Sequence, residues 1–84
     1  MDGKRFPNGI VAVEKQKANL NGADLYRANL ERANLTEANL RGANLERANF
    51  TEANLRGANL FHADLSGQNL DDLKSRGAII ITGQ

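Results

Sequence analysis

The chain has 84 residues, with 11 basic and 10 acidic side chains, a formal net charge of +1 and no cysteine. This length suits one small domain, and the absence of cysteine excludes disulfides and thiolate metal sites. The balanced charge lacks the footprint of a nucleic-acid-binding protein, and no apolar run is long enough to span a bilayer. Because the first residues also lack the apolar segment of a secretory signal, we expect a cytoplasmic protein with no nucleic-acid or membrane partner.

Residues 1–17 form the expected N-terminal capping segment. In it, Pro7-Asn8-Gly9 predict a turn and the following "IVAV" predicts a short β-prone run. We expect a strand, or a partial side, that closes the structure after it, with Phe6 and Ile10 as apolar plugs. The alternative is a frayed tail.

Residues 18–72 carry a five-residue repeat. Ten consecutive units from Ala18 to Gly67 begin with Ala, continue with Asn or Asp and then Leu or Phe, and end with two variable positions. A helix would scatter these leucines, because five residues advance about 500° around it, and a strand would alternate them between its faces. They are buried together only if the chain turns a corner every five residues, so that four units close one coil and successive coils stack at about 4.8 Å.

In such a coil the Leu or Phe points inward, as does the Ala two positions earlier, while the Asn or Asp between them points outward. The variable pair forms the corner, where small and polar residues suit a tight turn. No coil buries its leucines alone, so stability comes from neighbouring coils. The expected core stacks are Leu20, Leu40, Leu60 and Ile80; Leu25, Leu45 and Leu65; Leu30, Phe50 and Leu70; and Leu35 and Leu55.

Residues 73–84 form the expected imperfect final repeat with a C-terminal strand or cap. Gln68 and Leu73 stand in Ala positions and Ser75 stands in a Leu position. We expect the coil to continue imperfectly through "NLDDLKSRG". The alternative is a short helix that Asn69 caps and Gly77 ends. In both cases "AIIIT" resumes the register.

An apolar patch is expected near this end of the chain. Ile79 and Ile81 would point outward on either side of the inward Ile80, and Phe61 would lie in the corner column below Ile81. Exposed apolar patches are typical of partner surfaces, although high β-propensity in a terminal strand explains the same residues without a partner. The expected partner is a protein, and a second copy in an end-to-end two-fold contact is the simplest one.

The chain offers no catalytic constellation. Its one histidine, His62, stands at a corner without a cysteine or metal-ligand spacing around it. Ser66 and Ser75 have no paired histidine in a strained elbow, and Asp71-Asp72 is interpreted as a solvated corner. We therefore predict no enzyme activity, no catalytic residue, no metal and no cofactor, and corner pairs of mixed charge that keep the surface soluble.

The ten units resemble the pentapeptide-repeat family, whose pattern A-(D/N)-L-x-x they keep without a break from Ala18 to Gly67. The resemblance implies an all-β fold, a right-handed quadrilateral β-helix, which here would have about three to four stacked coils. It also implies a family abundant in cyanobacteria, mostly without assigned activity, in which some members dimerise through their C-terminal ends.

Some members of the family mimic duplex DNA and bind DNA gyrase, which requires a long and strongly acidic rod. The net charge of +1 and the short chain disfavour that role here. We therefore predict a non-catalytic structural or protein-interaction module, with a DNA-mimicking inhibitor or protector of gyrase as the alternative.

Overall fold

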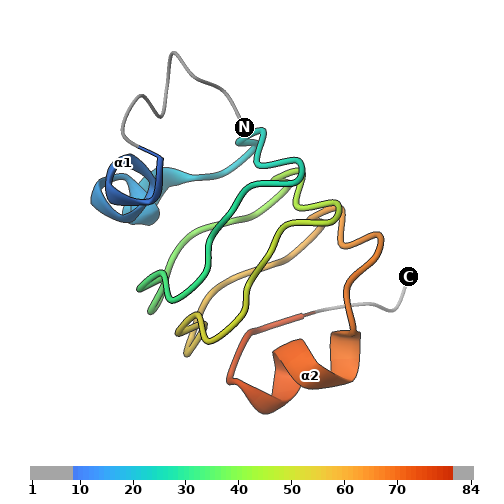
Figure 1. Cartoon of the computed structure of the whole chain (residues 1–84). Coiled ribbons are helices and arrows are strands. Elements are labelled where there is room, and N and C mark those ends of the chain that lie inside the picture. The colour runs from blue at the N-terminus through green and yellow to red at the C-terminus, as the bar shows by residue number, and fades with distance from the viewer. Residues whose placement is uncertain (1–8, 81–84) are drawn as a thin grey trace.

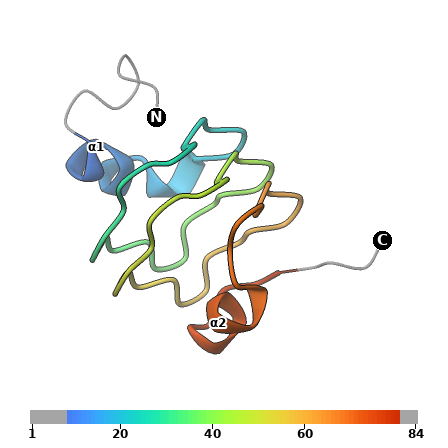
Figure 2. The same ribbon diagram turned by 45° about the vertical axis from the view of Figure 1, so that its right-hand side comes forward.

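The computed structural model describes residues 9–80 (Figure 1). Its elements in chain order are helix α1 (Ile10–Lys15), the 3-10 turn η1 (Lys17–Asn19) and helix α2 (Leu70–Ser75). Between η1 and α2 the chain winds as a stack of coils, with α1 at one end of the stack and α2 at the other (Figure 2). Within residues 9–80, β pairing consists of isolated parallel bridges and no continuous strand is present, so the all-β expectation does not describe the two helical ends.

The coil repeats every twenty residues. Each parallel bridge joins the Asn or Asp position of one coil to the same position of the next coil, so one turn holds four five-residue units. Each unit ends in a turn, which gives the coil four corners. The bridges are Asp24–Asn44, Asn29–Asn49, Asn34–Asn54, Asn39–Asn59, Asn44–Asp64 and Asn59–Ile79.

Every backbone N–H of an interior unit has its own acceptor. The Ala N–H bonds back across the corner, the Asn N–H donates to the coil before, and the Leu N–H donates to the coil after. The first corner N–H donates to the Asn side-chain oxygen of its own unit, and the second donates to the coil after. In unit 43–47 these five distances are 3.0, 2.9, 2.9, 3.1 and 3.0 Å in that order. The Asn or Asp at the second position therefore supplies the acceptor for the first corner N–H of its own unit.

The inward side chains form one continuous core. Among the described residues no buried side chain is polar or charged, so the core is held by apolar packing alone. Leu65 and Ile80 are partly buried against it. Its fully or nearly fully buried Leu and Phe members in the coils are Leu20, Leu25, Leu30, Leu35, Leu40, Leu45, Phe50, Leu55 and Leu60.

The N-terminal cap is a helix, so the expected strand is wrong. Ile10 and Val13 stand three residues apart on one face of α1, which is the spacing of neighbours on a helix. Val13 is completely buried and Ile10 is partly buried against the core, whereas Val11 is 50% exposed. Burying that face outweighs the β-propensity of these branched side chains. Phe6, the other expected plug, lies outside the described residues.

The chain also departs from the coil at the other end. The expected imperfect coil through residues 69–77 is wrong, and the helical alternative is correct. Asn69 caps α2 because its side chain accepts the Asp72 N–H at 3.1 Å, and two aspartates in the first turn suit the positive end of a helix. The sequence boundary placed after Asp72 therefore falls inside α2.

Helix α2 changes which leucine covers the core. Leu73 is 1% exposed, while Leu70 is 36% exposed and does not extend the stack of Leu30 and Phe50. Leu70 is the first residue of α2, and Leu73, almost one turn later, is the leucine that reaches the core. Pairing between coils then resumes at Gly77, whose carbonyl accepts the Gly57 N–H at 2.9 Å, and continues at Ile79, whose carbonyl accepts the Leu60 N–H at 2.9 Å.

Candidate interaction surface

The described residues offer no metal centre. No group of three or more His, Asp or Glu side chains in residues 9–80 is placed to hold an ion. His62 is exposed at its corner, and its ring lies 4.0 Å from the ring of Phe61, centroid to centroid, at an interplanar angle of 59°. No helix in the described part of the chain is long and apolar enough to cross a membrane.

The expected apolar patch is partly described. Ile79 is 50% exposed and stands in the outward column above Asn59, where earlier coils carry Asn. Phe61 is half-buried, because the guanidinium carbon of Arg41 in the preceding coil lies 4.8 Å from its ring centroid. Ile81 lies outside the described residues. Phe61 therefore offers less free surface than Ile79.

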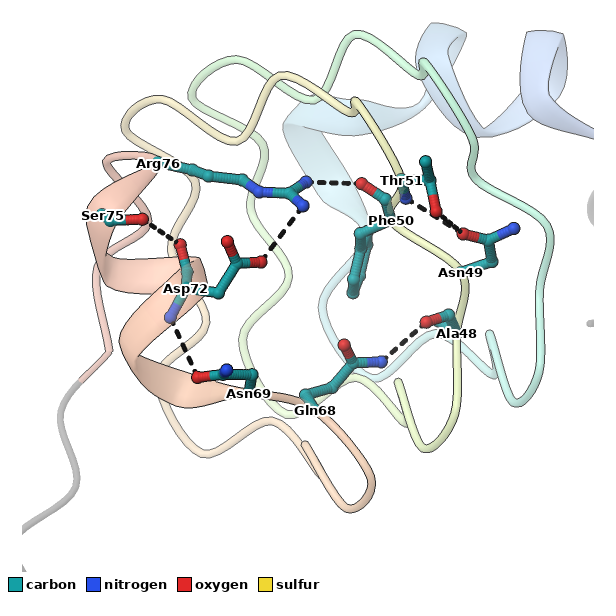
Figure 3. A network of polar contacts seen from close by, with 9 residues as sticks. All are labelled: Ala48, Asn49, Phe50, Thr51, Gln68, Asn69, Asp72, Ser75 and Arg76. Atoms are coloured by element: carbon teal, nitrogen blue, oxygen red, sulfur yellow. Dashed lines mark hydrogen bonds and ion pairs between the residues drawn. The ribbon is translucent and has the colours of Figure 1, made fainter.

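Two polar side chains attach the C-terminal helical segment to the coil above it (Figure 3). The Gln68 side-chain nitrogen donates to the Ala48 carbonyl at 2.7 Å. Arg76 donates to the Phe50 carbonyl and also pairs with Asp72 at 3.1 Å. These bonds hold residues 68–76 over the end of the core, where Leu73 is buried.

A third side chain performs the same task at the N-terminal end. The Asn34 N–H lies in the first coil and has no earlier coil to donate to. Glu14 of α1 supplies the acceptor through its Oε2, at 2.7 Å. Sequence reasoning missed Glu14, because nothing in the irregular first segment distinguishes it. The sequence did give a usable signal at the other end. Gln68 stands where the repeat has Ala, and it marks the unit where the coil stops.

Among the described corner residues, one ion pair joins charged side chains of neighbouring coils. Arg32 and Glu52, one coil apart, lie 2.9 Å apart with side chains 74% and 63% exposed. Exposed pairs of this kind contribute little to stability. At another corner, hydrogen bonds from the Ser66 hydroxyl and then its N–H hold the pKa of Asp64 below its ordinary value.

Comparison with known proteins identifies one match. A family model described as pentapeptide repeats matches the chain over residues 16–32 and 28–67, in eight copies. This covers more than half of the chain. No curated protein and no solved structure matches it.

Proposed function

Because the chain belongs to the pentapeptide-repeat family, we propose that it is a non-catalytic protein-interaction module whose coil is a right-handed quadrilateral β-helix. The twenty-residue spacing of the parallel bridges and the turn in every five-residue unit support this architecture. The outward Asn and Asp side chains of the repeat are used by the backbone, because their oxygens accept corner N–H groups. The repeat therefore builds a rigid support, and contact with a partner is left to the ends and corners.

The contact surface in this proposal is the C-terminal end around Ile79 and Phe61. The observation that carries it is the exposure of Ile79, which is 50% at a position where earlier coils carry Asn. An exposed apolar side chain in an otherwise polar column gives a partner something to bury. The partner is a protein, and a second copy meeting this end across a two-fold axis is the simplest one, because the same patch then serves both molecules.

The gyrase alternative gains no support. A mimic of duplex DNA needs a strongly acidic surface, and this chain has 11 basic against 10 acidic residues. The corner that carries Arg32 and Glu52 is neutralised by their ion pair rather than left acidic.

Sedimentation velocity over a concentration series tests the proposed contact. The wild type should dimerise, and Ile79→Arg should remain monomeric, because a buried unpaired charge is costly in an interface. Val11→Arg is the matched control, since Val11 has the same 50% exposure at the opposite end of the stack. A wild type that is monomeric throughout would exclude the second copy as partner. Dimerisation of Ile79→Arg at the wild-type concentration would place the contact elsewhere.

A further inference from the structure

The segment 68–77 replaces two units of the coil without changing the register on either side. Before it, the Arg47 N–H donates to the Ser66 carbonyl, and after it, the Leu60 N–H donates to the Ile79 carbonyl. Both bonds have the same sequence spacing as the regular bond from Leu25 to residue 44. The segment therefore has the length of two units, although it contains the helix α2.

The coil edge under α2 carries unpaired donors. In the first coil the corresponding N–H groups, those of residues 30, 32 and 35, donate to the second coil at 2.9, 2.8 and 2.9 Å. One coil later, the N–H groups of Phe50, Glu52 and Leu55 have no acceptor among residues 9–80. Phe50 is only 4% exposed and Leu55 is 0% exposed. A buried backbone donor without a partner is uncommon and costly.

Side chains replace part of the missing pairing. In a regular unit the Asn N–H donates to the Ala carbonyl of the coil before, as the Asn49 N–H does to Ala28 at 2.8 Å. At the helical segment the Gln68 side chain donates to the corresponding Ala48 carbonyl instead (Figure 3). The backbone groups at this coil edge are therefore still placed for pairing with a further coil, although α2 covers them.

We propose that residues 68–77 are a convertible end cap, in which the helical lid exchanges with two coil units in unchanged register. In the coil form, the carbonyls of residues 69, 71 and 74 take the places that accept the N–H groups of Phe50, Glu52 and Leu55. Leu70 turns inward over Phe50, and Leu73 leaves its buried position. The C-terminal end of the molecule then changes from a closed helical face to an open coil edge.

Opposing interactions keep the two forms close in free energy. The helix is favoured by the Asn69 cap, by the Asp72–Arg76 pair and by burial of Leu73. In the coil form Gln68 and Leu73 would crowd Ala positions, Lys74 would stand where the repeat has Asn, and Ser75 would leave a Leu position underfilled. The coil is favoured by the donors that α2 leaves unpaired and by burial of Leu70, which is 36% exposed on the helix. The proposal does not depend on the contact at Ile79.

Asp72→Gly tests the exchange, with Asp71→Gly as the matched control. Residue 72 is the second corner position, which has a positive φ in neighbouring units, as at Gly67 (83°) and Gly77 (91°). Glycine there favours the coil and weakens the helix. Glycine at residue 71, the first corner position, weakens the helix without this advantage to the coil. Backbone NMR should show that Asp72→Gly loses the helical Cα shifts of residues 69–76, and that amide exchange at Phe50 and Leu55 slows at least tenfold. Asp71→Gly should show no such slowing.

A second variant removes two of the misfits directly. Leu73→Ala combined with Ser75→Leu restores Ala and Leu at their repeat positions, while Gln68 and Lys74 still depart from the pattern, and should shift the segment to the coil form. Adding Leu70→Ala should then reduce stability far more than the same change does in the wild type, because only the coil form buries that side chain. Retention of helical shifts in the double variant would overturn the proposal. Loss of the helix without slower exchange at Phe50 and Leu55 would also overturn it, because it would show fraying rather than conversion.

Discussion

At the scale of single residues, Leu45 shows how the stack is stabilised. It is completely buried in the second coil, with a coil on each side of it. Leu45→Ala should lower the free energy of unfolding by about 2–5 kcal/mol, because the cavity cannot collapse between two fixed coils. Urea unfolding measures the loss. Leu70→Ala, at a position that is 36% exposed, is the control and should cost less than about 1 kcal/mol. Equal losses at the two positions would contradict the assignment of Leu45 to the core.

The corners store backbone strain. The second corner residue has a positive φ, which glycine adopts freely but any other residue adopts at a cost of about 1–2 kcal/mol. Glycine occupies several of these positions, but charged residues and one histidine accept the strain at the others. Those residues are Arg27, Arg32, Glu37, Arg47, Glu52 and His62, with φ between 54° and 62°.

Two glycine substitutions separate strain from crowding. Gly22→Ala meets only the strain, since φ is 72° and no atom lies within 4 Å of the added Cβ, so it should cost about 1 kcal/mol. Gly77→Ala has a φ of 91° and also places its Cβ 3.2 Å from the Arg56 Cα. Backbone cannot give way as a flexible side chain does, so the loss should be larger by about 1 kcal/mol or more. Thermal unfolding of the two variants compares them, and a smaller loss at Gly77 would show that the last corner is loosely packed.

At the scale of elements, repetition decides what the sequence predicts. The coil was predictable because ten units state the same pattern, and the Asn column, the Ala column and the corners each recur. The end caps occur once each and follow local rules that compete. "IVAV" favours a strand by propensity, but packing selects the helix that buries Val13. At the other end the capping signals of Asn69 and Asp72 outweigh the register of the repeat.

Helix α1 depends on Glu14 for its attachment to the first coil. Glu14→Ala removes the acceptor of the Asn34 N–H, bonded at 2.7 Å, and should cost about 1 kcal/mol of unfolding free energy. Glu14→Gln keeps an oxygen at the same position and should cost less. Urea unfolding of the two variants, with amide exchange at Asn34 as the local probe, measures the difference. Faster exchange at Asn34 is expected in Glu14→Ala, and unchanged exchange there would show that the contact does not hold the helix.

At the scale of the whole molecule, the coil is a one-dimensional stack in which each coil contacts only its neighbours. Stability should therefore rise as coils are added. The end caps are compatible with added coils, because their side chains bond to backbone groups that every coil of the repeat presents. Gln68 and Arg76, for example, bond to the backbone carbonyls of Ala48 and Phe50. Any coil of the same pattern presents such carbonyls at the same places.

An insertion tests this additivity. A second copy of residues 38–57 placed after Gly57 adds one complete coil and presents copies of Ala48 and Phe50 to α2. The variant should unfold at a higher urea concentration. Its urea m-value should rise by about a quarter, since m follows the surface exposed on unfolding. The control copies only residues 38–55, which omits one corner pair, and should be less stable than the parent because the later units lose their register. Equal stability of the two insertions would contradict this additivity, because it would mean that the units fold independently of their alignment.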